Sequence, residues 1–323
     1  MRIRDFYERA VKYGIEADPR GVDEVGEDLK RSKKDYESLK DKEKDFFDNE
    51  RFTNPYADTR ILFGDEEKEI KRILLGIDME VGEVLLADRL AERGTPVDLI
   101  VAHHPEGRAM AELHDVMDMQ AGILLKQGVP IHVAENLMAE RVKEVERRLR
   151  PVNHTRSVDA ARLLNIPFMC MHTPSDNLVT TYLQDLIEKE NPRYTSEVLD
   201  ILNAIPEYED ARKEAVAPSM TVGTKERRVG KVFVDMTGGT GGSKKIFDSL
   251  STAGVGTVVG MHISEEHRKE AQKHHINVIL AGHISSDTLG LNLLLDKIID
   301  DNTEVLACSG FRRITAKERE KRS

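Results

Sequence analysis

The stretch Asp98-Leu-Ile-Val-Ala-His-His-Pro-Glu-Gly107 decides the fold and holds the most informative pair of residues in the chain. Its four apolar residues, 99–102, predict a short buried strand that the following proline and glycine end. Side chains alternate between the two faces of a strand, so His103 and His104 converge only where the backbone turns at the strand's end. Open α/β sheets bind ligands at the carboxyl ends of their strands, and imidazole is a ligand for zinc, iron, copper or nickel. The pair therefore indicates a metal site; the alternative is a capping histidine beside a surface histidine.

Two later apolar runs also end in a histidine. Residues 166–171 lead into His172-Thr-Pro-Ser-Asp176, and residues 276–281 lead into Gly282-His283-Ile-Ser-Ser-Asp287. In both cases a carboxylate follows four residues after the histidine. Mixed histidine and carboxylate ligands from several strand ends fit one divalent ion, or two ions bridged by a shared carboxylate.

In this order, the motifs resemble those of the NGG-interacting factor three family, often labelled type 2 GTP cyclohydrolase I. The signatures of that family are a His-His-Pro run, a His-Thr-x-x-Asp run and a late Gly-His followed by an acidic residue. Here they correspond to residues 103–105, 172–176 and 282–287, and the run Gly238-Gly-Thr-Gly-Gly242 resembles the family's glycine-rich turn. The resemblance covers residues 72–182 and 228–300.

The resemblance implies a centre of divalent metal ions, two in number, with zinc, iron or manganese as the candidates. The implied metal ligands are His103, His104, Asp176, His283 and Asp287. The residues implied at the edge of the site, or facing the substrate, are His172, His262, His267, Gly239 and Gly241; for His262 and His267 the alternative is a plain surface position. The family usually carries glutamate where this chain has Asp287, so the reach of this side chain is one methylene shorter. A different alignment places Glu135 at the middle strand end, as a rival ligand to Asp176.

From residue 71 onward, short apolar runs alternate with helical patterns, which favours mostly parallel sheets covered on both faces. We therefore predict an α/β protein of two layered lobes that face a central metal cleft, with a helical N-terminal extension. The extension is predicted at residues 1–70, the first lobe at 71–184, an insertion or linker at 185–227 and the second lobe at 228–323. In the first lobe, residues 130–134 are predicted to form a strand and residues 139–150 a helix.

The glycine-rich turn lies in the run Thr237-Gly-Gly-Thr-Gly-Gly-Ser-Lys244-Lys245, between a predicted strand and a predicted helix. It does not match a nucleotide-binding Walker A motif, which needs Gly-Lys followed by Ser or Thr. Glycines permit unusual backbone angles, and free N–H groups at the start of a helix attract anions. Together with the two lysines, the turn indicates a phosphate-bearing substrate; a tight packing turn is the alternative. Glu106, next to the histidine pair, is a candidate general base, and an exposed charge is its alternative.

Composition narrows the class of protein. The formal net charge of −10 argues against a general nucleic-acid binder. The only two cysteines, Cys170 and Cys308, lie in apolar runs, as in a reduced cytosolic protein. No apolar stretch approaches the ~20 residues of a membrane helix, and the N-terminus lacks the apolar core of a signal peptide. We therefore expect a cytoplasmic protein without a membrane partner.

These patterns lead to one functional hypothesis and one alternative. The hypothesis is a metal-dependent hydrolase that acts on a small phosphate-bearing or nucleotide substrate; the family label implies GTP cyclohydrolase activity. The alternative is a non-catalytic metal-binding scaffold or protein-interaction module. The resemblance also implies a homo-oligomer.

Overall fold

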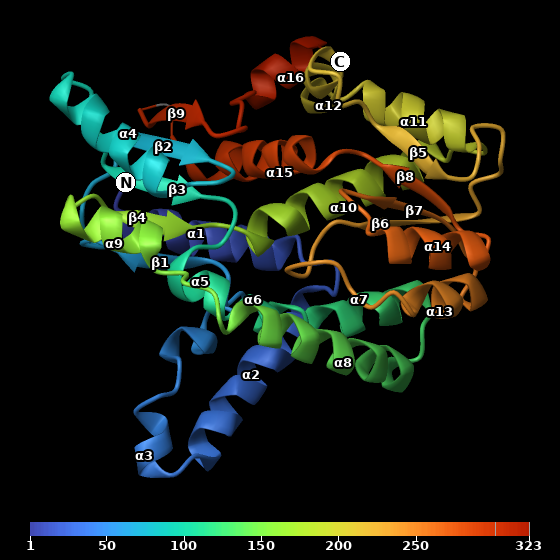
Figure 1. Cartoon of the computed structure of the whole chain (residues 1–323), viewed down its shortest axis with the longest axis horizontal. Helices are drawn as coiled ribbons and strands as arrows, with labels where there is room; N and C mark the ends of the chain where they lie inside the picture. The colour runs from blue at the N-terminus through green and yellow to red at the C-terminus, as the bar shows by residue number, and fades with distance from the viewer. Residues whose placement is uncertain (301, 323) are drawn as a thin grey trace.

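Two separate β-sheets form the framework of the computed structural model, which describes residues 1–300 and 302–322 (Figure 1). The first sheet has the strand order β1 (Arg60–Phe63), β4 (Phe168–Cys170), β3 (Leu99–Ala102), β2 (Arg72–Gly76) and β9 (Glu304–Cys308). The second has the order β5 (Ser219–Val222), β8 (Asn277–Leu280), β7 (Val255–Gly260) and β6 (Lys231–Asp235). Neighbouring strands run parallel except at one edge of each sheet, where β1 and β5 are antiparallel. The predicted α/β class with mostly parallel sheets is confirmed.

Helices cover both faces of each sheet because the strands carry apolar side chains on both sides. In β2, Leu74 belongs to a core with α4 (Val81–Glu92) and α9 (Arg156–Leu163), whereas its neighbour Leu75 belongs to a core on the opposite face. The outer face of the second sheet packs against α7 (Met119–Gln127), α8 (Ile131–Leu149), α13 (Ile246–Thr252) and α14 (Glu265–Lys273). This layered arrangement is the one that continuous apolar strands require.

Two long helices, α10 (Thr173–Glu190) and α15 (His283–Ile298), pack against each other between the sheets (Figure 1). Each contributes side chains to the inner cores of both sheets, as Leu178 and Val179 show for α10. Gly290 allows their close approach, because a Cβ at this position would lie 2.4 Å from the carbonyl oxygen of Ser175. The first turns of both helices are therefore fixed at the boundary between the two lobes.

One predicted strand is wrong. Residues 130–134 are not extended: Pro130 precedes the continuous helix α8, and the helix predicted at 139–150 is its second half. Ala134, Met138 and Val145 are buried at helical spacing and pack into the core under the second sheet. The apolar run is therefore the buried face of an amphipathic helix, which a short window does not distinguish from a strand.

Sheet membership also crosses the predicted domain boundaries. Strand β1 lies within the range predicted as the N-terminal extension, and β5 lies within the predicted insertion. Strand β9, in the C-terminal range, adds to the first sheet beside β2 instead of to the second sheet. Asp301 and Ser323, which also fall in the predicted second lobe, lie outside the described residues.

The N-terminal region is helical, as predicted. Its helices are α1 (Ile3–Glu16), α2 (Val22–Ser38), α3 (Asp41–Lys44) and the 3₁₀ helix η1 (Asn49–Phe52). Helix α1 packs into the core between the first sheet and helices α10 and α15, whereas α2 projects from the body with only Val25 buried (Figure 1). The remaining helices are α5 (Gly107–Ala111), α6 (Leu113–Val116), α11 (Thr195–Asn203), α12 (Pro206–Lys213) and α16 (Ala316–Arg322). Among the described residues, no helix has the length and apolar character needed to cross a bilayer.

Candidate metal centre

The three strand-end motifs meet at one place. His103 and His104 follow the last residue of β3, and His172 lies between β4 and the first turn of α10, which carries Asp176. The third motif follows β8, where His283 and Asp287 occupy the first turns of α15. Because residues four apart lie on the same face of a helix, each helix presents its carboxylate on the side of its histidine. The predicted convergence of these motifs is therefore present in the structure.

Each of the two carboxylates lies between histidine rings. The Nε2 atom of His103 is 3.5 Å from Asp176 Oδ1 and 3.4 Å from Asp287 Oδ1, so His103 stands at the centre of the group. The other oxygen of Asp176 is 3.5 Å from His172 Nε2. The Oδ2 atom of Asp287 is 3.5 Å from Nε2 of His104 and 3.5 Å from Nε2 of His283. All of these separations are too long for good hydrogen bonds.

The central atoms of this group are buried and have no hydrogen-bond partner among the described residues. They are Nε2 of His103, Oδ1 of Asp176 and both carboxylate oxygens of Asp287, whose residue is only 1% exposed. An unsatisfied buried polar group costs about 1–3 kcal/mol, and a charged one costs more. Two overlapping triads, His103 with His172 and Asp176, and His103 with His104 and Asp287, each bring one potential ligand atom per residue within 4.8 Å of the others. The donors therefore fit a metal ion, which coordination would satisfy in place of hydrogen bonds.

A second layer of side chains fixes the orientation of the histidines. Asp58 Oδ2 lies 2.8 Å from Nδ1 of His172, and Asp78 Oδ1 lies 2.6 Å from Nδ1 of His104. The Nδ1 atom of His103 is 3.0 Å from the hydroxyl of Ser175 and 3.3 Å from the carbonyl oxygen of Met171. A proton held at Nδ1 leaves the Nε2 lone pair free for a metal, as is usual for metal-binding histidines.

Sequence reasoning missed both of these aspartates and gave His172 only a place at the edge of the site. Asp78 follows two residues after β2, so an acidic residue at the end of a strand was a signal that was available. Asp58 lies 114 residues before its partner His172 and outside every motif, so nothing local identifies it. His172 belongs to one of the two triads, which makes it as close to the donor group as the residues expected to be ligands.

The pKa values reflect this crowding of charge. Burial raises the pKa of Asp176 to about 8, against the opposing attraction of His172. Asp287 is also buried, but the neighbouring His103, His104 and His283 hold its pKa well below its ordinary value. Burial alone would lower the pKa of His172, yet Asp176 and Asp58 raise it to about 9. At neutral pH, a metal ion therefore competes with protons on Asp176 and His172.

For the central histidine the effect of burial prevails, because it outweighs the attraction of Asp287 and is reinforced by the neighbouring His172 and His104. It lowers the pKa of His103 to about 4, with Asp287 only partly opposing the shift. The ring of His103 is thus neutral at physiological pH. A neutral imidazole offers the lone pair that a metal needs.

A cavity of about 80 Å³ opens beside the donors. Its lining residues are His172, Asp176, Asp235, Met236, Thr237, Gly239, Thr240, Gly241, Met261, His262, His283 and Asp287. The ring of His262 stands edge-on to that of His283, with centroids 5.0 Å apart, and burial lowers the pKa of His262. Asp235, at the end of β6, was not singled out in the sequence; burial raises its pKa to about 6.

Of the expected residues, His103 and His104 belong to the donor group without lining this cavity, whereas His267 and Glu106 belong to neither triad and do not line it. His267 lies behind the glycine-rich turn, with Nε2 3.0 Å from the carbonyl oxygen of Gly242 and Nδ1 2.6 Å from the hydroxyl of Ser264. Glu106 accepts a hydrogen bond of 3.1 Å from Ser157, and its position next to the histidine pair in sequence does not bring it into the cavity.

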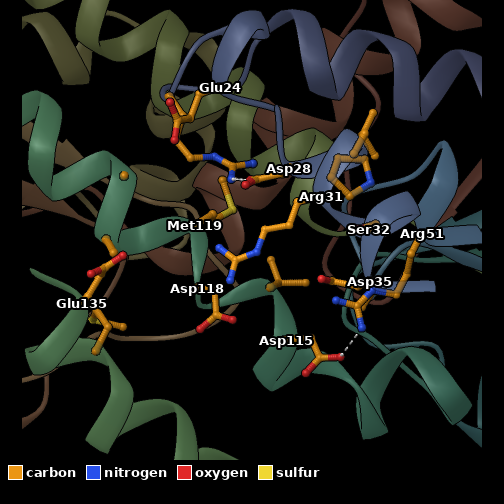
Figure 2. A pocket seen from close by; sticks show the side chains of 18 of the residues that line it. Glu24, Asp28, Arg31, Ser32, Asp35, Arg51, Asp115, Asp118, Met119 and Glu135 are labelled. Carbon is orange, nitrogen blue, oxygen red and sulfur yellow. Dashed lines mark hydrogen bonds and ion pairs between the residues drawn. The ribbon is translucent and has the colours of Figure 1, made fainter. Parts of the chain in front are cut away.

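The rival ligand Glu135 lies in a different part of the molecule. It is exposed on α8 and lines a separate cavity of about 600 Å³ between α2 and the helices α7 and α8 (Figure 2). Charged side chains such as Arg31 and Asp118 also line this cavity (Figure 2). The geometry therefore favours Asp176 over Glu135 as a ligand.

Comparison with solved structures finds a likeness to one family. The NIF3 superfamily protein from Sphaerobacter thermophilus superposes with a TM-score of 0.70 at 28% sequence identity, over 79% of this chain and 92% of that one. The chain is similar to this NIF3 superfamily protein in both sequence and fold. This confirms the resemblance of the sequence motifs to the NGG-interacting factor three family.

More distant likenesses within the comparison include reduced HcgD from Methanocaldococcus jannaschii and a Bacillus cereus protein related to NIF3. HcgD matches with a TM-score of 0.48 at 16% identity, over 76% of this chain and 87% of that one. The B. cereus protein matches with a TM-score of 0.41 at 11% identity, over 77% and 89% of the two chains. The sequence itself matches no family model and no curated protein.

Proposed function

We propose that this protein binds two divalent metal ions and hydrolyses a small phosphate-bearing or nucleotide substrate with their help. The observation that carries the proposal is the set of buried, unpartnered donor atoms on His103, Asp176 and Asp287, which face one another. Asp176 beside His172, and Asp287 beside His104 and His283, offer two separate groups of donors, which supports two ions instead of one. Mixed imidazole and carboxylate donors suit zinc, iron or manganese.

Divalent ions at these donors supply Lewis acidity, which polarises a substrate and lowers the pKa of water. The protein's own residues divide the remaining work. Asp176 and Asp287 would hold the ions and offset their positive charge, and both oxygens of Asp287 face histidines. Asp58 and Asp78 hold protons on the far side of His172 and His104, which keeps the Nε2 atoms directed inward.

The size of the cavity limits what the site encloses. Pockets that bury a whole drug-sized ligand occupy about 300–1,000 Å³. The cavity beside the donors is about 80 Å³ and accommodates a reacting group, not an entire nucleotide. We therefore propose that the rest of any nucleotide, GTP included, lies outside this cavity.

The lysines of the glycine-rich turn do not support phosphate binding in the way the sequence suggested. Lys244 pairs with Glu266 at 2.7 Å and Lys245 pairs with Glu140 at 3.1 Å, and neither lysine lines the cavity. Helix α13 begins only at Ile246, so its first turn is not at the cavity either. These lysines therefore give no support to a phosphate contact at the cavity.

The first test is the metal content per chain, measured by elemental mass spectrometry on protein purified without added metal or a histidine tag. We expect about two equivalents in the wild type and fewer in Asp176→Ala. Turnover of a phosphoester or nucleotide that stops on chelation and returns with metal would support the hydrolase. Metal bound without turnover across such a panel would support the non-catalytic scaffold, and no metal after reconstitution would contradict both. The expected homo-oligomer stays a prediction, which light scattering tests.

A further inference from the structure

The carbonyl groups of the glycine-rich turn, residues 237–242, are held by side chains on one side of the turn. Gln120, a buried residue of α7, donates from Nε2 to the carbonyl oxygens of Gly238 at 2.6 Å and Thr240 at 2.7 Å. Arg141 donates from Nε to the carbonyl oxygen of Gly241 at 2.9 Å. The turn is thus fixed through its acceptors, from the direction of α7 and α8.

Peptide geometry then dictates the direction of the turn's donors. All peptide bonds of the described chain are trans, and in a trans peptide unit the C=O and N–H groups point in opposite directions. The N–H groups of Gly239 and Gly241 belong to the same peptide units as the two carbonyls that Gln120 holds. They therefore point away from Gln120.

The cavity beside the metal donors borders this turn. Gly239 and Gly241 line it, whereas Gln120 does not. Within residues 1–300 and 302–322, no acceptor forms a hydrogen bond with either N–H group. Two fixed and unused donors thus face a cavity whose other lining residues include the buried Asp176 and Asp287, which carry unpartnered oxygens. Adjacent backbone N–H groups in a turn form concave sites for anions.

We propose that the backbone N–H groups of Gly239 and Gly241 bind an oxygen of the substrate's phosphate group while another of its oxygens faces the metal donors. This inference rests on the proposed function, because without metal the ionised carboxylate of Asp287 repels an anion. Gln120 acts as a positioning residue, since it touches the turn and not the cavity. The turn, and not its lysines, supplies the phosphate contact.

Besides Asp176 and Asp287, Asp235 is the one acidic residue that lines the cavity, and its carboxylate repels a phosphate when it is ionised. No side chain in the described part of the chain bonds to its carboxylate, so it acts directly on whatever occupies the cavity. Burial raises its pKa to about 6, which keeps part of the population neutral in mildly acidic solution. A protonated Asp235 donates a hydrogen bond to a phosphate oxygen instead of repelling it.

The test uses the full-length protein loaded with zinc, and inorganic phosphate as the probe, with binding measured by isothermal titration calorimetry. Gln120→Met keeps the length of the side chain but removes its donor. Gln127→Met makes the same change on the same helix, away from the turn. Because hydrogen bonds to a charged group are strong, we expect Gln120→Met to weaken phosphate binding by about tenfold or more, with zinc content unchanged. Gln127→Met is expected to bind phosphate like the wild type.

A second pair of variants removes one donor directly. Gly241→Pro lacks the N–H group, whereas Gly241→Ala keeps it, and a Cβ at this position meets no atom within 4 Å. We expect phosphate to bind more weakly to Gly241→Pro than to Gly241→Ala. Equal affinities in this pair, or an unchanged affinity in Gln120→Met, with zinc bound in every case, would overturn the inference and leave the proposed function intact.

Nuclear magnetic resonance on the wild-type protein tests the same inference without any substitution. In ¹⁵N-labelled, zinc-loaded protein, phosphate should shift the amide protons of Gly239 and Gly241 downfield, as new hydrogen bonds to an anion do. Phosphate binding that leaves both resonances in place would contradict the inference. Failure of the wild type to bind zinc would contradict the proposed function and this inference together.

Discussion

The substitution Asp287→Asn is the sharpest test of the metal centre, because Asn has the shape of Asp without its charge. Asp287 is 1% exposed, and its two oxygens lie 3.4–3.5 Å from the Nε2 atoms of three histidines. Structural zinc sites contribute roughly 10–16 kcal/mol shared among about four ligands, or about 3 kcal/mol each. The variant should therefore bind metal about 100-fold more weakly, at about 1.4 kcal/mol for each factor of ten.

Unfolding in the presence and absence of metal measures this loss independently of any substrate. A metal concentration 1,000 times the dissociation constant raises the free energy of unfolding by about 4.1 kcal/mol. At the same concentration, a 100-fold weaker variant gains only about 1.4 kcal/mol. Competition with a chromophoric chelator gives the affinity itself. The matched control is Glu135→Gln, an exposed carboxylate on α8 outside the centre, which should bind metal like the wild type. Wild-type affinity in Asp287→Asn, or an equal loss in both variants, would refute the assignment.

Three further predictions follow from the same geometry. Asp58→Asn should lower metal affinity about 10- to 100-fold, because Asp58 orients His172 at 2.8 Å; chelator competition measures this, and an unchanged affinity argues against the orienting role. With metal removed by a chelator, the free energy of unfolding should fall as pH rises from about 6.5 to about 9. The pKa of His172 is about 6.5 in the unfolded chain and is raised to about 9 in the folded protein, so its protonation stabilises the fold fully only below about pH 6.5. Asp176, with its pKa raised to about 8, loses stabilisation in the same direction, so a urea-unfolding profile that is flat or rising over this range would be inconsistent with both shifts. Asp235→Asn should tighten phosphate binding to the zinc-loaded protein above pH 6, because it removes the opposing carboxylate, and calorimetry that shows weaker binding would indicate a different role for Asp235.

The elements that the sequence predicts well are those with local signals at both ends. Helix α14 is predictable from local signals because Ser264 caps it, accepting a hydrogen bond from the N–H of His267, and a charged pattern follows. Strand β3 is a run of four buried residues that the His-His-Pro motif ends, so its bounds were also predictable. The positions of the three ligand motifs were predictable for the same reason, since each motif directly follows a strand.

The parts that escaped prediction depend on contacts between residues far apart in sequence. Arg72 in β2 and Glu304 in β9 are 232 positions apart, and no local pattern announces that these strands pair. Asp58 escaped prediction for the same reason, because only the folded chain brings it next to its partner His172. The error at residues 130–134 has a different origin: the apolar run was too short to show whether its period was that of a strand or of a helix.

The place of β9 in the first sheet has a consequence for synthesis on the ribosome. Strand β2 presents an unpaired edge until residues 304–308 emerge, some 232 positions later than Arg72. At 5–20 residues per second, this interval is on the order of 10–50 s. For most of that time, the nascent chain contains the two histidines that follow β3 but neither the α15 ligands, which are made shortly before β9, nor the strand that closes the sheet. The first lobe therefore completes its sheet only after the second lobe has been made, and a chain that ends before β9 exposes an edge open to pairing with other chains.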